Sequence, residues 1–342
     1  MAFITLNKAH YFHNLDILCA KAGGKKSVMA VLKDNAYGHG LVEMASLASE
    51  YGLKKAAVKN LSEANAIISY FDEVLILADH PPLAEVSSKI SYAVHDYESL
   101  AQFSTSTALH LGIDTGMHRN GVREEELDKA FLFIAEKGLN LKGIYTHFRS
   151  SDELNSEFFW QRSNFERARD KIQKLIAEHH LPAVAFHAFN SAGLLRTSSL
   201  RGDNFARCGI AMYGYTTLDA RIAQSPLKHV LSLWAEKLSS RTLKKGERVG
   251  YGGLYEALQD ERISTYDIGY GDGFFRFDGS KPLVMANGLK TKGRMSMDSF
   301  CVGGEEDRVC MFEDATHLAQ AFNTISYEIV TKLSPFIKRI II

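Results

Sequence analysis

Lys33 is the most informative residue of this 342-residue sequence, because it ends the apolar run SVMAVLK and opens the polar segment KDNAYGHG. A lysine at the end of an apolar strand is partly withdrawn from water, which favours the neutral amine that attacks carbonyl carbons in Schiff-base chemistry. From the strand alone, a lysine that simply reaches for solvent explains the position at least as well. The glycines of NAYGHG allow a tight turn that lets Tyr37 and His39 face the same mouth, and this favours the chemical interpretation.

Polar residues that suit catalysis or anion binding also follow other apolar runs. They are Asp34, Asn35, Asp114, His118, Arg119, His147, His187, Asn190, Ser191, Arg207, Gly209 and Ile210. In barrels of alternating strands and helices, the active site lies at the carboxyl ends of the strands. We therefore expect these residues to gather at one mouth if the preceding runs are such strands.

Up to about residue 220, short apolar or β-branched runs alternate with segments whose apolar residues recur three and four positions apart. The first pattern predicts strands, and the second predicts helices with one buried face. Strict alternation implies right-handed βαβ units, and about eight units exceed the number in the usual doubly wound sheet. We expect an α/β fold with a (β/α)8 TIM-like barrel. The expected strands are 27–33, 55–58, 73–78, 92–95, 108–113, 142–148, 183–189 and 206–214.

After about residue 225 the helical patterns nearly vanish, and runs joined by Gly, Asp and Lys-Gly turns predict a mainly antiparallel β domain. One helix near 315–322 and two short strands are expected to finish the chain. The predicted domains are a barrel at 6–222 and a β domain at 223–342, with residues 1–5 as a candidate addition to the β domain. The expected strands of the β domain before that helix are 231–243, 248–255, 263–270, 282–297, 299–304 and 309–314.

The composition excludes several classes of protein. The 40 basic and 40 acidic residues cancel, whereas nucleic-acid binders usually carry a basic excess. A local anion site remains possible, because backbone N–H groups can hold a phosphate. The four cysteines show no zinc-binding spacing, so we predict free thiols, no metal site and a reducing compartment. Neither a signal peptide nor an apolar run of about 18 residues is present, which indicates a cytoplasmic protein without a membrane span.

Nine segments of the sequence, in order and with plausible spacing, resemble the motifs of alanine racemases. This family uses pyridoxal phosphate and has a TIM-like barrel followed by a β domain. The resemblance runs from the first strand to about residue 339, and nine ordered motifs are far more specific than any one of them. The segments are VLKDNAYGHG, DTGMHRNG, YTHF, NSAGLLR, RCGIAMYG, VGYGGLY, IGYGDG, GRMSMD and ISYE.

The resemblance implies a role for each candidate cofactor residue. Lys33 is expected to bind pyridoxal phosphate covalently. Arg207, with His187 as its partner, is expected to face the pyridine nitrogen and keep it unprotonated, since arginine does not readily give up a proton. Ser191 also opens a short helical stretch that can point N–H groups at an anion, although taken alone it would be an ordinary helix N-cap. The phosphate is expected to be held by Tyr37, Ser191, the N–H groups of Gly209 and Ile210, and Tyr327, with His147 as a further cofactor-binding residue.

Racemisation needs proton removal on one face of Cα and proton delivery on the other. The resemblance implies Lys33 and Tyr251 as these two groups. Because Tyr251 lies in the β domain, it also implies a homodimer in which the partner's β domain completes each site. Arg119 and the N–H of Met297 are expected to bind the substrate carboxylate, since the arginine fork matches a carboxylate. The access corridor is expected to contain Asp152, Tyr270, Arg276, Arg294 and Ile325.

Three positions depart from the family pattern. Many members have a carbamylated lysine, which orients the arginine, where this chain has Gly112. His118 replaces a glycine beside Arg119 and is a candidate substitute for that lysine. Asp34 stands where Ala or Pro is usual, and it either favours the charged form of Lys33 or points away.

The function expected from the sequence is interconversion of L- and D-alanine for peptidoglycan synthesis. Racemisation of another small amino acid such as serine stays open, because one small group changes selectivity by only about 1–3 kcal/mol. A non-catalytic pyridoxal-phosphate-binding protein would lack the β domain, so Tyr251 and the roughly 120 residues beyond the barrel argue against it. A decarboxylase is disfavoured by Arg207, since decarboxylation profits from a protonated ring nitrogen.

Overall fold

The computed structural model describes residues 1–277, 279 and 281–342. The chain divides into two compact units. The barrel unit consists of Phe12–Asp34 and Met44–Lys228, and the β unit consists of Met1–Tyr11, Asn35–Glu43 and His229–Ile342. No sequence pattern indicated that the short segment Asn35–Glu43 belongs with the β unit.

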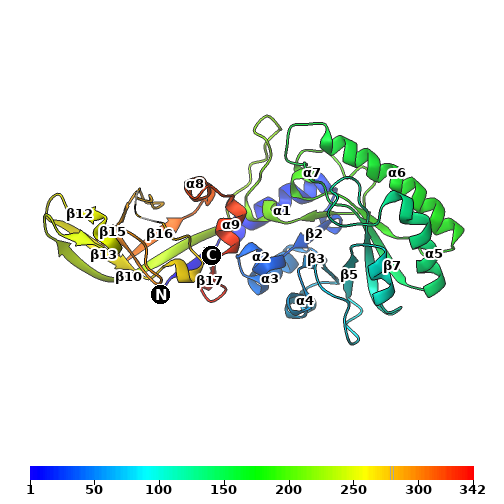
Figure 1. Ribbon diagram of the computed structural model, residues 1–342, viewed down its shortest axis with the longest axis horizontal. Coiled ribbons are helices and arrows are strands. Elements are labelled where there is room, and N and C mark those ends of the chain that lie inside the picture. Colours follow the sequence, from blue (N-terminus) through cyan, green and yellow to red (C-terminus); the bar gives the residue numbers. More distant parts are fainter. Residues whose placement is uncertain (278, 280) are drawn as a thin grey trace. The chain divides into compact units, whose positions relative to one another are not determined.

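The barrel unit is built on one sheet of eight parallel strands in the order β8-β7-β6-β5-β4-β3-β2-β9 (Figure 1). Backbone hydrogen bonds from Asn204 to Phe186 (2.7 Å) and from Arg207 to Phe189 (2.9 Å) join the segments of the two edge strands, so the barrel is nearly closed. All eight strands expected from the sequence are confirmed. They are β2 (Val28–Val31), β3 (Lys55–Val58), β4 (Glu73–Ile76), β5 (Ile90–Val94), β6 (Ala108–Gly112), β7 (Asn140–Tyr145), β8 (Ala185–His187) and β9 (Ala206–Cys208).

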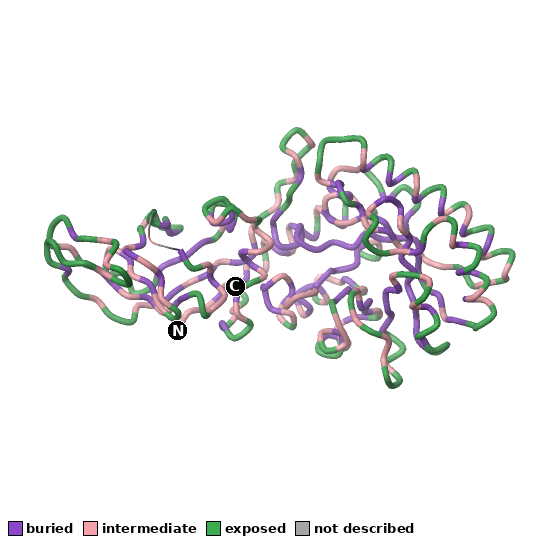
Figure 2. The backbone as a smooth tube through the Cα atoms, viewed as in Figure 1, coloured by how far each residue is buried: buried purple, intermediate pink, exposed green. Residues whose placement is uncertain are grey.

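Helices follow most of these strands, as the periodic apolar residues predict, but the expected strict alternation is broken: a segment without a helix joins β4 to β5, and only a 3-10 turn lies between β5 and β6. In the longest helix, α6, the buried residues recur every three or four positions from Phe158 to Leu175. Figure 2 shows the consequence, with buried strands inside and exposed helix faces outside. None of the helices in the described residues is long and apolar enough to cross a membrane. The helices of this part of the chain are α1 (Lys8–Ala22), α2 (Lys33–Tyr37), α3 (Leu41–Tyr51), α4 (Leu61–Ile67), α5 (Leu127–Lys137), α6 (Glu157–Glu178) and α7 (Ser191–Leu195). Short 3-10 turns lie at Lys25–Ser27, Ile68–Tyr70, Glu98–Gln102, Glu124–Glu126 and Ile210–Tyr213.

The β unit contains a mainly antiparallel sheet in the order β14-β15-β13-β10-β1-β17. Its central strand, β10, pairs with β1, β13 and β16, while the β1–β17 pair is parallel. A separate small hairpin joins β11 and β12. The strands are β1 (Phe3–Leu6), β10 (Leu231–Leu243), β11 (Arg248–Val249), β12 (Tyr255–Glu256), β13 (Glu261–Tyr266), β14 (Thr291–Lys292), β15 (Phe300–Gly303), β16 (Arg308–Phe312) and β17 (Lys338–Ile341). Further 3-10 turns lie at Tyr251–Gly253 and Tyr270–Asp272.

The end of the chain differs from the prediction. The helix near 315–322 is confirmed as α8 (Thr316–Ala321), but a second helix, α9 (Ser326–Thr331), stands where a strand was expected. The β-branched residues there favour a strand locally. Burial of Ile329 and Val330 anchors this short helix in the core and outweighs that preference.

Two predicted strands of the β unit are shorter than expected. The run 248–255 is broken by a turn in which Gly250, Gly252 and Gly253 have positive φ of 77°, 75° and 55°. Such angles suit glycine and end the strand pairing. The run 282–297 keeps only β14 and an isolated bridge between Val284 and Lys290.

Candidate active site

Lys33 opens α2, a turn with unusual handedness. The four non-glycine residues after it, Asp34 to Tyr37, have φ between 51° and 55°, which is the left-handed region. The Asn35 carbonyl accepts the Gly40 N–H at 3.0 Å, and its side chain accepts the Leu41 N–H at 2.8 Å. Strained backbone of this kind persists where the surroundings over-determine it, commonly at ligand sites.

Three cations converge on His147 at the carboxyl ends of the barrel strands. Burial, followed by the charges of Arg207, Arg119 and Lys33, lowers the pKa of His147 to about 3. His147 is therefore neutral at physiological pH. A neutral ring among three positive side chains leaves an excess of positive charge that an anionic ligand can balance.

Arg207 is buried, and its orientation is fixed. Its Nη1 donates to His187 Nδ1 at 2.7 Å and to the His187 carbonyl, and its Nη2 donates to the Thr146 carbonyl at 2.6 Å. Burial lowers the pKa of Arg207 to about 10, so the guanidinium stays protonated at neutral pH. The residue is thus a permanent donor, as required of a group facing an unprotonated ring nitrogen.

Ser191 lies beside the backbone of Gly209. Its Oγ accepts the N–H groups of Gly209 at 2.9 Å and Ala211 at 3.5 Å, which leaves the hydroxyl proton to donate to a ligand. The alternative that Ser191 is the helix N-cap is wrong. Asn190 caps α7 by accepting the Gly193 N–H at 2.8 Å.

Tyr37 and Tyr327 meet within the β unit. Their ring centroids are 6.2 Å apart at an interplanar angle of 65°. The close approach depends on Gly38, because a Cβ at this position would lie 1.8 Å from the Val330 carbonyl oxygen. His39, for which the sequence suggested a place at the mouth, is fully buried, and burial lowers its pKa to about 3.

Tyr251 and Met297 are exposed on the β unit, with 65% and 54% of their surfaces accessible. Met297 packs its backbone against the turn at Tyr270, where the Gly271 N–H donates to the Met297 carbonyl at 2.8 Å. Arg276 lies over the Tyr270 ring, 5.9 Å from its centroid.

The space beside Gly112 is occupied by Tyr145. A Cβ at Gly112 would lie 3.0 Å from the Tyr145 hydroxyl oxygen, so no longer side chain fits there unless Tyr145 moves. His95 Nε2 donates to the Leu77 carbonyl at 2.9 Å, so its Nδ1 accepts the Tyr145 hydroxyl at 3.1 Å. Burial raises the pKa of Tyr145 to about 12, which keeps this hydroxyl protonated.

Arg119 lies near this pair, since its positive charge opposes protonation of His95 and favours ionisation of Tyr145. Within the described part of the chain, Arg119 has no hydrogen bond or ion pair, so its guanidinium is available to a ligand. Sequence reasoning missed Tyr145 and His95. Gly112, a small residue where a long one is usual, was the signal that another group fills the space.

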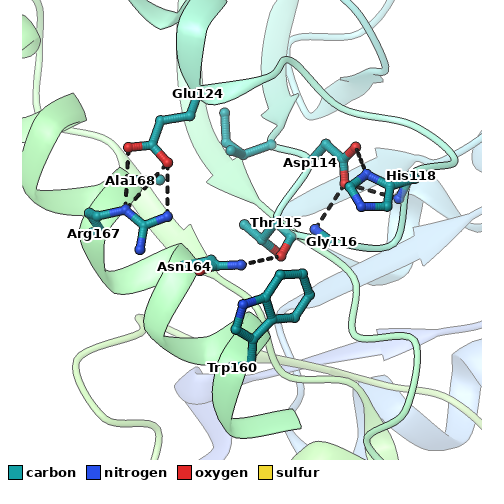
Figure 3. Close-up of a pocket in the computed structure, with 10 residues that line it drawn as sticks. Asp114, Thr115, Gly116, His118, Glu124, Trp160, Asn164, Arg167 and Ala168 are labelled. Atoms are coloured by element: carbon teal, nitrogen blue, oxygen red, sulfur yellow. Dashed lines mark hydrogen bonds and ion pairs between the residues drawn. The ribbon is translucent and has the colours of Figure 1, made fainter. Parts of the chain in front are cut away.

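The other two departures have local partners of their own. His118 Nδ1 contacts Asp114 Oδ2 at 2.9 Å, so the candidate substitute holds an aspartate instead of Arg119 (Figure 3). Asp34 pairs with Lys59 at 3.2 Å, which supports the alternative that it points away from Lys33.

A cavity of about 150 Å³ lies beside the Asp114–His118 contact (Figure 3). Trp160 and the Glu124–Arg167 ion pair form part of its wall. None of the cations around His147 lines it, so this cavity is separate from the cation cluster.

Comparison with known proteins agrees with this architecture. The family model for the alanine racemase N-terminal domain matches residues 6–217, and the model for the C-terminal domain matches residues 230–341. The alanine racemase of Campylobacter concisus (strain 13826) is 48% identical over 339 residues, covering 99% of each chain.

Two solved structures extend the likeness to the whole fold. The alanine racemase of Bacillus anthracis with bound L-Ala-P is 28% identical with a TM-score of 0.85, covering 100% of this chain and 95% of that one. The alanine racemase of Bartonella henselae with covalently bound pyridoxal phosphate is 25% identical with a TM-score of 0.83, covering 100% and 99%. With both family models matched along nearly its whole length, the chain belongs to the alanine racemase family.

Proposed function

We propose that this chain is an alanine racemase, an isomerase that interconverts L- and D-alanine with pyridoxal phosphate and supplies D-alanine for peptidoglycan. The relatives and the family models support the activity. The observation that carries it is the convergence of Lys33, Arg119 and Arg207 on the neutral ring of His147.

The residues present fit the cofactor. Its aldehyde requires a primary amine, which Lys33 offers at the mouth of the barrel. Its ring nitrogen requires a donor that stays protonated, which the buried Arg207 supplies. For the phosphate, the barrel unit offers the hydroxyl proton of Ser191 and the N–H of Ile210, whereas the Gly209 N–H, also expected to bind it, already donates to Ser191 Oγ at 2.9 Å. Tyr37 and Tyr327 are the further phosphate-binding residues that the family resemblance implies. Once bound, the cofactor withdraws electrons from the substrate and so acidifies its Cα–H bond.

Two groups of the chain move the proton. Lys33 Nζ takes it from Cα on one face, and Tyr251 Oη delivers one on the opposite face, with the roles exchanged in the reverse direction. Arg119 orients the substrate by donating two parallel N–H groups to its carboxylate, and the Met297 N–H donates a third. Arg207 stays a donor throughout, which limits side reactions because it does not protonate the ring nitrogen.

The active form is a homodimer with shared sites. Tyr251 and Met297 are largely exposed on the β unit, whereas an acid–base phenol works best when water is excluded. A partner subunit's barrel supplies the missing cover. All four cysteines are free thiols, as expected of a protein that works in the cytoplasm.

Racemisation of serine is the second candidate function. The observation that favours it is Gly112 at the position of the usual lysine, beside the carboxylate-binding arginine, with the Tyr145 hydroxyl 3.0 Å from where its Cβ would be. Competition between L-alanine and L-serine in one reaction mixture distinguishes the two substrates by their kcat/KM ratio.

The test of the proposed function uses the purified enzyme with its cofactor. The protein is expected to be yellow, and borohydride is expected to fix the cofactor on Lys33. In deuterated water, L-alanine should become D-alanine labelled at Cα. Tyr251→Phe should nearly abolish L-to-D turnover and keep the colour, while the matched control Tyr255→Phe, four residues away, should stay active. Full activity of Tyr251→Phe would contradict the two-base assignment.

A further inference from the structure

A row of polar side chains crosses the interior of the barrel. Lys55 and Glu73 are the first residues of β3 and β4, so they lie at the end of the barrel away from the catalytic mouth, and they form an ion pair. Glu73 Oε1 lies 3.1 Å from His110 Nε2, and His110 Nδ1 lies 2.8 Å from His187 Nε2. His187 Nδ1 then contacts Arg207 Nη1 at 2.7 Å.

The two imidazoles of this row are 1% and 0% exposed, so no solvent competes for their nitrogens. Room for His110 comes from Gly143 on β7, where a Cβ would lie 2.3 Å from His110 Nδ1. His187 is held further by stacking on Phe205, with ring centroids 4.4 Å apart.

The chemistry of arginine allows only one arrangement of protons along the row. Arg207 has no acceptor, so His187 Nδ1 must accept its N–H. His187, whose pKa is far below its ordinary value because of burial, is neutral and carries its single proton on Nε2. That proton is donated to His110 Nδ1, and His110 must therefore carry its own proton on Nε2, facing Glu73.

Glu73 completes the row with a negative charge. Burial alone would raise its pKa, but His110 and Lys55 outweigh that effect and lower the pKa to about 2. The Glu73 carboxylate lies 3.1 Å from His110 Nε2 and attracts the N–H dipole of the ring. The carboxylate favours the form of His110 whose N–H dipole points toward it.

We propose that Glu73, held by Lys55, is a positioning residue for Arg207, and that it acts by fixing the tautomers of His110 and His187. In this arrangement each N–H group of the row, from Arg207 through His187 to His110, points toward Glu73. The row orients the guanidinium, so that its remaining N–H groups face the cofactor, and it relays no proton. The link to the cofactor rests on the proposed function of Arg207, whereas the proton arrangement does not depend on it.

The proton arrangement can be observed directly by NMR of protein labelled with [15N]histidine, with and without cofactor. His110 and His187 are both expected as Nε2–H tautomers. An Nδ1–H signal from either residue would overturn the proposal. Loss of racemase activity with both tautomers intact would count against the proposed function alone.

Variants distinguish a role of Glu73 in positioning Arg207 from an effect on the stability of the whole protein. Glu73→Gln keeps the shape and removes the charge. It should produce a second tautomer of His110, shift the His187 signals and weaken binding of pyridoxal phosphate to the apoprotein roughly tenfold. Lys55→Met keeps the carboxylate and should have a smaller effect. Glu124→Gln, which breaks the exposed ion pair with Arg167, is the matched control and should leave the histidine signals unchanged.

Gly143→Ala provides a second route if Glu73→Gln does not fold. Its methyl group displaces His110 without changing any charge, so it should disturb the same His187 signals. Unchanged His187 signals in a folded Glu73→Gln or Gly143→Ala protein would refute the role of the row.

Discussion

Acid should destabilise this protein well above the range in which its carboxylates titrate, because two of its histidines are fully buried. His39 in the β unit and His187 in the barrel unit are both 0% exposed. Burial lowers the pKa of His39 to about 3 and that of His187 well below its ordinary value. In the unfolded chain both return to about 6.5.

The sign and size of the effect follow from proton linkage. Below pH 6.5 the unfolded state binds a proton at each position and the folded state does not, so stability falls as the pH falls through 6.5. At pH 5.0, about 1.5 units lower, each histidine costs about 2 kcal/mol. The depressed pKa of Glu73, about 2, adds stability that is lost only below its ordinary value of 4.5. The interval from pH 6.5 to 5.0 therefore isolates the histidines.

Urea unfolding of the apoprotein at pH 7.5, 6.5, 5.5 and 5.0, followed by circular dichroism, measures this loss. His147, whose pKa is also lowered to about 3, adds about 2 kcal/mol to the loss from His39 and His187. The free energy of unfolding should therefore fall by about 6 kcal/mol in all for a single transition, or by about 4 kcal/mol in the barrel unit and about 2 kcal/mol in the β unit for two. His39→Asn keeps a donor for the Tyr37 carbonyl and should reduce the pH dependence. The exposed His180→Asn is the control. Equal stability at pH 7.5 and 5.0, or an unchanged slope in His39→Asn, would refute the reasoning.

Three further predictions concern the barrel unit. Gly112→Ala places a Cβ 3.0 Å from the Tyr145 hydroxyl and should raise the KM for alanine several-fold with a smaller change in kcat, as steady-state kinetics would show. Asp203→Ala removes one of the two carboxylates that lie 2.9 Å from the buried guanidinium of Arg162, the other being Glu166, and it should cost about 3 kcal/mol in urea unfolding. Ser191→Ala removes the hydroxyl proton offered to the phosphate and should weaken cofactor binding about fivefold in a fluorescence titration, corresponding to about 1 kcal/mol.

The barrel was predictable because its signal is repeated. Each strand of the barrel unit is a short apolar run between amphipathic helices, and β2 to β9 all lie where the sequence predicts them. The gathering of the polar residues that follow these strands was predictable for the same reason, since parallel strands of a barrel end at one mouth. Local patterns failed where packing decides, as in α9, whose burial of Ile329 outweighs a sequence that favours a strand.

Apart from the contact between His187 and Arg207, which the family resemblance implied, the row from Lys55 to Arg207 was beyond sequence reasoning for a different reason. Its members come from β3, β4, β6, β8 and β9, and no spacing along one chain says which inward-facing residues of different strands touch. Glu73 and Lys55 stand at the amino ends of their strands, where charged residues are ordinarily solvated. Gly143 was the one local sign, because a glycine inside a strand often marks the close approach of another group.

The left-handed turn after Lys33 is adopted against the preference of non-glycine residues for the right-handed backbone region. A left-handed residue with a side chain costs about 1–2 kcal/mol, so the four from Asp34 to Tyr37 cost on the order of 4–8 kcal/mol together. The two hydrogen bonds that Asn35 accepts, and the contact that Gly38 makes possible with Val330, hold the end of the turn in place. Because the backbone after Lys33 has so little freedom, the direction in which the amine leaves the strand is set by the turn.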